Sequence, residues 1–129
     1  MTDIYDPANF VKVCVNTVLE VVRESAPLGG PRMYYLCHRK TREFTTSFRY
    51  HLLVIFFENR EELLPHLRVM ANNMAEDPEE HRLIWSLMQT FLHSLLTPIT
   101  VRRLVEDSRA TTDWLTGEMD ILSRTIFRE

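Results

Sequence analysis

Apolar residues recur at helical spacing along most of the chain, and prolines mark where one run gives way to the next. A first helix should begin at Asp6-Pro7, because aspartate caps free backbone amides and a proline at the first helical position loses no hydrogen bond. It should end near Ser25, before Pro27 and Pro31. Its apolar residues are Phe10, Val11, Cys14, Val18, Leu19 and Val22 on one face, widened by Val13, Val15 and Val21.

The segment 32–57 admits two structures. Apolar and polar residues alternate through its second half, which favours a β-hairpin within 33–57. However, no Asn-Gly or Asp-Gly turn separates the candidate strands. The alternation also fails in the run 52–57, where both faces are apolar. Because the same residues recur equally well at helical spacing, we favour a helix from Thr41 to Glu58.

Start signals for helices are clearer in the second half of the chain. Asn59 and Glu62 resemble a capping box, in which the two side chains bond reciprocally to free amides at a helix start. The helix that follows should run from Arg60 to Met74. Pro65 lies too deep for a first-turn proline, so we expect it to kink this helix or delay its start.

The strongest start signal is Asp77-Pro78, which opens a helix running to about Leu96. Apolar residues cover more than half of the circumference of this helix, which predicts that it is the central one. A Thr-Pro pair then begins a short helix that ends near Asp107.

A last helix should begin near Thr111 or Thr112. The sequence as a whole predicts one domain, residues 1–129, folded as a compact all-α bundle of five to seven helices. An α+β fold with one hairpin in 33–57 is the alternative. The apolar stripe of the last helix has heptad-like spacing and consists of Leu115, Met119, Leu122 and Ile126.

Composition places the chain among ordinary globular proteins, with 45% hydrophobic and 26% charged residues. No apolar run approaches the roughly 20 residues of a membrane-spanning helix. Asp3 and Asp6 precede the first apolar stretch, unlike the basic start of a secretory signal. We therefore expect a soluble protein of the cytoplasm or nucleus that needs no cofactor. Cys14 and Cys37 lack metal-site or redox spacing, and we expect both thiols to be buried.

Positive charge is concentrated between positions 32 and 51. This stretch has five basic residues and the single acid Glu43, whereas the whole chain has a net charge of −3. Aromatic residues are interleaved with the basic ones, a mixture in which rings can stack on bases while guanidiniums meet phosphates. The same charges can instead form a solvated rim or dock an acidic partner, so RNA binding is an alternative function. The basic patch comprises Arg32, Arg39, Lys40, Arg42 and Arg49.

The sequence offers no catalytic constellation and no metal site. Phosphate loops, nucleophile elbows and H-E-x-x-H motifs are absent, and the five histidines include no i, i+4 pair. Arg60 and His66 resemble the R-x(4–6)-H signature of helical HEPN-type ribonucleases, which would imply RNA cleavage by this pair. Arg32 and His38 match the same spacing. We expect a non-enzymatic protein, with a HEPN-like ribonuclease as the second alternative.

Two apolar surfaces look larger than a small bundle needs: the valine-rich first helix and the run 52–57. Large exposed apolar patches mark protein–protein contacts. We therefore expect an interaction or adaptor domain, self-associating as a homodimer, of the kind found in viral or eukaryotic regulatory factors. The size and class are similar to Bcl-2-like modules, although the Asn-Trp-Gly-Arg signature is absent. The expected apolar partner-binding residues are Val13, Val15, Val21, Leu53 and Phe57.

Overall fold

The computed structural model describes residues 6–25 and 31–108, and these residues form six α-helices and no strand. The predicted all-α bundle is therefore confirmed, and the hairpin alternative in 33–57 is wrong. The last predicted helix, from Thr111 or Thr112, lies outside the described residues. The helices are α1 (Pro7–Glu24), α2 (Pro31–Arg42), α3 (Thr46–Glu58), α4 (Arg60–Met74), α5 (Pro78–Leu95) and α6 (Pro98–Ser108).

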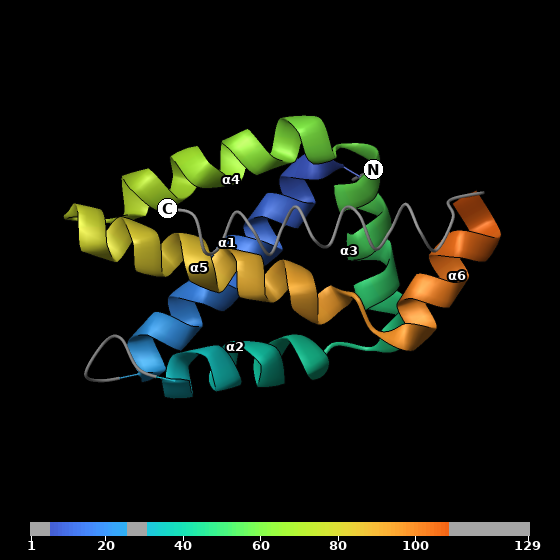
Figure 1. Cartoon of the computed structure of the whole chain (residues 1–129), viewed down its shortest axis with the longest axis horizontal. Coiled ribbons are helices and arrows are strands. Elements are labelled where there is room, and N and C mark those ends of the chain that lie inside the picture. Colours follow the sequence, from blue (N-terminus) through green and yellow to red (C-terminus); the bar gives the residue numbers. More distant parts are fainter. Residues whose placement is uncertain (1–5, 26–30, 109–129) are drawn as a thin grey trace.

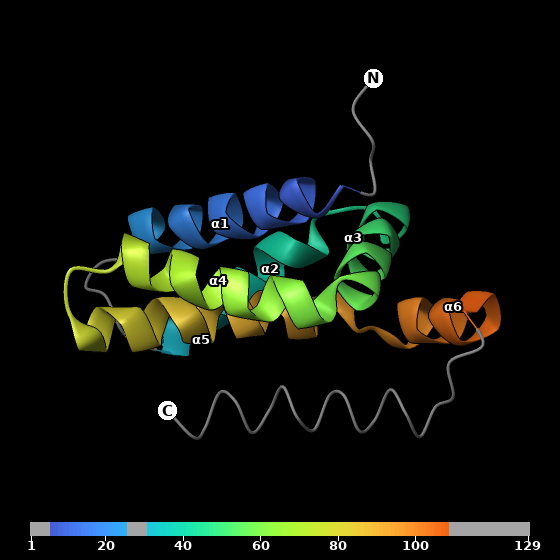
Figure 2. The ribbon, with the colours of Figure 1, turned by 90° about the horizontal axis from the view of Figure 1, so that it is seen from above.

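Helix α5 is the centre of the bundle, as its broad apolar surface predicts. Helices α2 and α4 flank it on two sides, and α1 crosses behind it (Figure 1). Helices α3 and α6 pack together at the end of the bundle where α5 ends. In the view turned by 90°, α1 lies on one side of the bundle and α5 on the other (Figure 2).

An aromatic cluster joins three helices in the core. The ring of Phe10 on α1 stacks on Phe56 of α3 at a centroid distance of 5.7 Å, and it meets the edge of Phe91 on α5 at 5.9 Å. Phe10 and Phe91 are fully buried and Phe56 nearly so. Such pairs add about 0.5–1.5 kcal/mol beyond the burial of apolar area. The cluster therefore fixes α1 and α3 against α5.

Side-chain caps fix four of the helix starts, and at α6 the Thr97 hydroxyl accepts from the Thr100 amide at 3.3 Å. Asp6 accepts a hydrogen bond from the Ala8 amide at 3.0 Å, and Asp77 accepts one from the Glu80 amide at 2.8 Å. Both confirm the predicted Asp-Pro starts. Thr45 likewise accepts from the Phe48 amide at 3.1 Å. The Thr45 cap was not predicted, and it explains why α3 begins at Thr46.

The sequence prediction is only partly right for the segment 31–58. The favoured helix from Thr41 to Glu58 is helical over most of its length, but it is interrupted at residues 43–45. Helix α2, before the interruption, was not predicted. Its buried face consists of Met33, Cys37 and Thr41, spaced four apart, and two of these three residues are not strongly apolar.

Asn59 does not form the predicted capping box. Its side chain makes no capping hydrogen bond to α4, and its Nδ2 instead donates to the Ile55 carbonyl at 2.8 Å. Asn59 is the single residue between α3 and α4, and its side-chain amide bonds a carbonyl in the last turn of α3 instead of the first turn of α4. The predicted bounds of α4 are confirmed, and Pro65 lies inside the helix without delaying its start.

The expected apolar partner surface is largely core. Val21, Leu53 and Phe57 are 0%, 1% and 9% exposed. Val13 and Val15 are half-buried and pack against the same core. The expectation that these residues exceed what one chain can bury is wrong for Val21, Leu53 and Phe57, because their side chains pack in the core of the bundle.

Replacing Phe10 with alanine should lower the free energy of unfolding by about 3–5 kcal/mol, since it removes a fully buried ring and leaves a cavity among three helices. Urea unfolding followed by circular dichroism measures the change. The control is Ile99→Ala on α6, where the side chain is 66% exposed and the cost should stay within about 0.5 kcal/mol. Equal costs for the two substitutions would contradict the placement of Phe10.

Candidate functional site

Helix α2 presents a basic and aromatic stripe to solvent. Its inward face packs on α1 and α5, and the exposed residues at spacings of three, four and three lie on the opposite side. At 1.5 Å per residue the stripe is about 15 Å long. Tyr35 is 67% exposed, which is unusual for so large a ring. We call this surface the α2 stripe, and it consists of Arg32, Tyr35, Arg39 and Arg42.

Lys40 belongs to the predicted basic patch but not to the stripe. Its ammonium group lies 2.9 Å from a Glu24 carboxylate oxygen and 3.4 Å from one of Glu20, both on α1. The hydrogen bond to Glu24 is the main cause that raises the pKa of Lys40. Lys40 therefore ties α2 to α1, whereas no carboxylate among the described residues pairs with the three stripe arginines.

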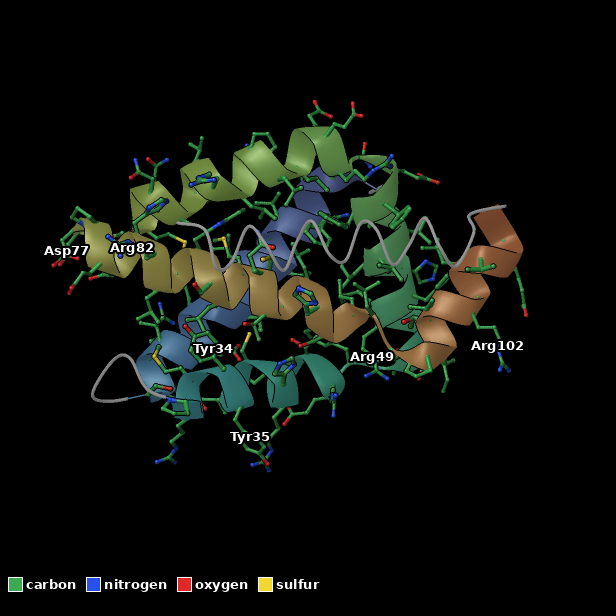
Figure 3. All side chains as sticks on the ribbon, viewed as in Figure 1. Tyr34, Tyr35, Arg49, Asp77, Arg82 and Arg102 are labelled. Carbon is green, nitrogen blue, oxygen red and sulfur yellow. The ribbon has the colours of Figure 1, made fainter. Side chains whose placement is uncertain are left out.

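The remaining basic residues lie on other helices. Arg49 is half-buried on α3, where its guanidinium donates to the Thr46 hydroxyl at 3.3 Å. On α6, Arg103 covers the Tyr50 ring at 4.2 Å and pairs with Asp107. Arg102 projects from α6, well away from Tyr35 (Figure 3). The structure thus brings together three of the five predicted basic residues.

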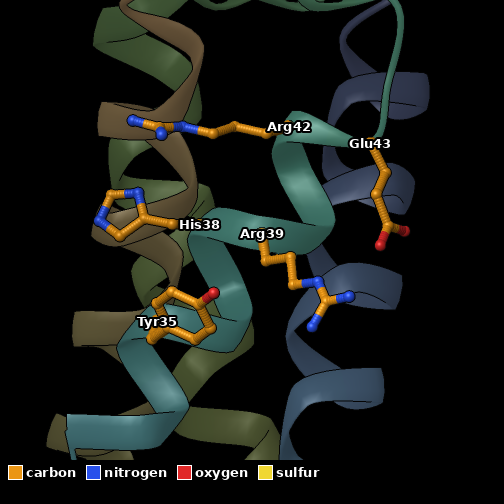
Figure 4. Close-up of a pocket in the computed structure, with 5 residues that line it drawn as sticks. All are labelled: Tyr35, His38, Arg39, Arg42 and Glu43. Atoms are coloured by element: carbon orange, nitrogen blue, oxygen red, sulfur yellow. The ribbon is translucent and has the colours of Figure 1, made fainter.

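An open hollow of about 600 Å³ borders the stripe. Tyr35, His38 and Arg42 extend to one side of α2, and Arg39 and Glu43 extend to the other (Figure 4). Because the hollow is wide and has charged walls, it can accept an extended acidic chain or an anionic group. Arg39 and Arg42 belong to the predicted basic patch, whereas the contribution of His38 and Glu43 to this hollow was not predicted.

His38 is held by a polar contact with α5. Its Nδ1 atom hydrogen-bonds the Ser94 hydroxyl, and that hydroxyl donates to the Thr90 carbonyl at 2.8 Å. Since a hydroxyl has one proton, His38 Nδ1 is the donor in this arrangement. Ser94 is 4% exposed. This serine–histidine pair therefore joins two helices and is not an accessible nucleophile with its base.

Burial and neighbouring charge act on two histidines beside the stripe. Desolvation, and after it the Arg42 guanidinium, lower the pKa of His38. Desolvation, and after it the His38 imidazole, lower the pKa of His93 on α5. Both rings are therefore held neutral in the folded protein to a lower pH than in the unfolded chain.

The ribonuclease-like pair does not converge. The guanidinium of Arg60 donates to the Phe57 carbonyl at 2.6 Å and lies over the Phe57 ring, while His66 is exposed farther along α4. Six residues along a helix separate two side chains by about 9 Å axially and about 120° around it. The paired acids Glu61/Glu62 and Glu79/Glu80 lie in first turns of helices, where they favour the helix dipole.

Within residues 6–25 and 31–108 no three histidine, cysteine or acidic side chains are grouped so as to hold a metal ion. Over the same ranges, no helix combines the length and apolar character that crossing a bilayer requires.

Between α1 and α3 lies a small apolar hollow of about 240 Å³, and its lining includes Val13, one of the two expected apolar residues that are half-buried. Val13 shares this hollow with Phe48, which is 38% exposed. Phe48 also packs edge-on against Phe44 at 5.2 Å. The sequence allows two positions for Phe48, in the apolar stripe of the helix or among the aromatics interleaved with the basic residues, and its exposure lies between the two.

Comparisons with protein-family models, curated proteins and solved structures find no match to this chain.

Stability should fall as the pH drops from about 7.5 to about 5.5, because the unfolded chain takes up protons that folded His38 and His93 resist. With folded pKa values below the unfolded value, this contribution is complete above the unfolded pKa and is lost as the pH approaches the folded pKa. Urea unfolding across this range measures the slope. His38→Gln/His93→Gln should flatten it, whereas exposed His66→Gln should retain the parent slope.

Both cysteines should be inert to thiol reagents in the folded protein. Burial raises the pKa of Cys37 to about 12 and raises that of Cys14 well above its usual value. Both side chains are 0% exposed. Ellman's reagent at mildly alkaline pH should therefore label neither thiol until urea unfolds the chain. Rapid labelling in the absence of urea would contradict the packing of α1 on α2.

Proposed function

We propose that this protein is a non-enzymatic protein-interaction domain whose α2 stripe binds an acidic segment of a protein partner. The observation that carries the proposal is the contrast within one helix. Lys40 is neutralised by two carboxylates of α1, while Arg32, Arg39 and Arg42 have no acidic partner among the described residues. The three arginines follow one face of a rigid helix, and the Arg39 and Arg42 guanidiniums reach to opposite sides of that face. These unpaired groups are available for a ligand.

The residue types of the stripe suit a carboxylate-bearing ligand. Each guanidinium presents a planar set of donors that matches a carboxylate with two parallel hydrogen bonds. Tyr35 supplies a rigid aromatic surface, and Tyr and Arg are the residue types enriched at energetically important interface positions. A stripe of about 15 Å spans four or five residues of extended chain at about 3.3 Å each.

The rest of the surface favours a short acidic peptide over a nucleic acid. The net charge of the chain is −3. Exposed acids lie in the first turns of α4 and α5, outside the stripe. A long polyanion would meet these acids on either side, whereas nucleic-acid domains usually carry basic charge over the whole binding face. Exposed Tyr35 could stack on a base, so RNA binding is kept as an outcome of the test.

The proposal does not depend on self-association. That expectation came from an apolar surplus, and Val21, Leu53 and Phe57 lie in the core. Self-association as a homodimer stays a prediction, to be decided by light scattering. The stripe itself is polar and suits a reversible partner.

The stripe can be tested with a short fluorescein-labelled peptide in which glutamate and alanine alternate. Fluorescence anisotropy should show binding to the parent chain that weakens as salt rises from about 50 to about 200 mM. Arg39→Glu/Arg42→Glu should reduce affinity at least about tenfold, since two favourable charge contacts become repulsive. Tyr35→Ala should reduce it less.

The matched control is Lys12→Glu/Arg102→Glu, which changes net charge equally at exposed positions outside the stripe. It should remain within about twofold of the parent. Equal losses in both double variants would show that only net charge matters, and the proposed site would be wrong. Tighter binding of a single-stranded RNA of equal charge would assign the stripe to nucleic acid instead.

A further inference from the structure

Helix α5 contains buried polar groups without partners on one line of its surface. Trp85, Gln89 and His93 are spaced four residues apart, so they follow one stripe of the helix. The indole N–H of Trp85, both amide atoms of Gln89 and Nε2 of His93 are buried and have no hydrogen-bond partner. Leaving a buried amide without a hydrogen-bond partner is unfavourable, because the group loses its bonds to water. Such a line is expected only where something that could supply partners lies against it.

The other described helices do not account for this burial. Phe91 of α5 faces α1, where it packs on Phe10. Gln89 and His93 precede and follow Phe91 by two residues, so each lies about 160° around the helix from it. They therefore face away from α1, yet Gln89 is 0% exposed.

Helices α2 and α4 occupy the flanks of α5. Ser94 contacts His38 of α2, and Trp85 lies under the Arg68 guanidinium of α4. Figures 1 and 2 show no labelled helix across the face of α5 that points away from α1. A further segment must cover this outer face.

The chain beyond α6 has the length and pattern to do so. Twenty-one residues follow Ser108. As a helix, the segment 112–127 would be about 24 Å long, against about 27 Å for the eighteen residues of α5. Helix α6 begins near the end of α5 and leads away from it, so Ser108 lies about 16 Å farther along. The chain beyond Ser108 can reverse there and return antiparallel toward the outer face of α5.

The sequence of this segment also matches the chemistry of the face. Its predicted apolar stripe, Leu115 to Ile126, would cover the apolar residues on the outer face of α5. Three hydroxyl residues border one edge of that stripe at about 60–100° around a helix, and they would bring donors and acceptors to the unpartnered groups of α5. These hydroxyl residues are Thr112, Thr116 and Ser123.

We infer that residues 112–127 of the same chain dock as an amphipathic helix on the outer face of α5. Attachment to α6 gives the segment a high effective concentration at this face, which favours its own chain over a second copy. The docked segment completes the enclosure of the central helix. This inference concerns a different surface from the α2 stripe and does not rest on the proposed function.

Tryptophan fluorescence in the full chain tests the inference. The sequence has two tryptophans, so Trp114→Phe leaves Trp85 as the sole reporter of the α5 face. In that background, Leu122→Gln/Ile126→Gln removes half of the apolar stripe. The control, Asp120→Gln/Arg124→Gln, alters the opposite side of the predicted helix, and both double variants keep the net charge. Acrylamide quenching of Trp85 should rise roughly twofold in the first variant and stay unchanged in the control.

Protection of Cys14 and Cys37 from Ellman's reagent verifies that the core remains folded. If Leu122→Gln/Ile126→Gln exposes these thiols, the milder variant Leu122→Ala is used in its place, and its quenching is compared with that of the same control. Equal quenching in the stripe variant and the control would overturn the inference. Protection of Trp85 that is lost on dilution, together with dimers in light scattering, would also overturn it, because a second copy would then be the occupant.

Discussion

The burial of α5 is the constraint on which the remaining structure depends. An eighteen-residue helix that is apolar over most of its circumference must be covered on nearly every side. Helices α1, α2 and α4 each turn their apolar residues toward it, and the Phe10–Phe56–Phe91 cluster ties α3 to the same centre. The orientation of α2 follows from this. Because Met33, Cys37 and Thr41 point inward, the stripe arginines on the opposite face of α2 are directed outward.

Much of the fold could be predicted because several helix boundaries are set by local chemistry. Asp6-Pro7 and Asp77-Pro78 carry their caps and prolines in adjacent positions, so their starts are visible in the sequence. Helix α2 was missed because tertiary packing creates its inward face. Thr41 is fully buried and bonds the Cys37 carbonyl at 2.8 Å, an environment that its residue type does not predict. The role of Asn59 was likewise decided by the neighbouring helix.

The candidate site could be predicted in part. The concentration of arginine between positions 32 and 51 can be seen in the sequence. Which of these basic residues share a solvent-facing surface, and which pair with acids of other helices, cannot. Lys40 leaves the patch because Glu20 and Glu24, sixteen to twenty residues earlier, meet it across two helices. The apolar surface was misjudged for a related reason. Hydrophobicity along one element does not distinguish a face that packs on the chain's own core from one that awaits a partner, as Leu53 and Phe57 show.

The central role of α5 is tested most directly by amide hydrogen exchange on the intact protein. Amides that open only when the whole domain unfolds exchange slowest, and those at the edge of the fold exchange through local openings. The structure predicts that the middle of α5, around Phe91, exchanges at the rate of global unfolding and that α6 exchanges much faster. Exchange in the middle of α5 as fast as in α6 would contradict a fold built around this helix.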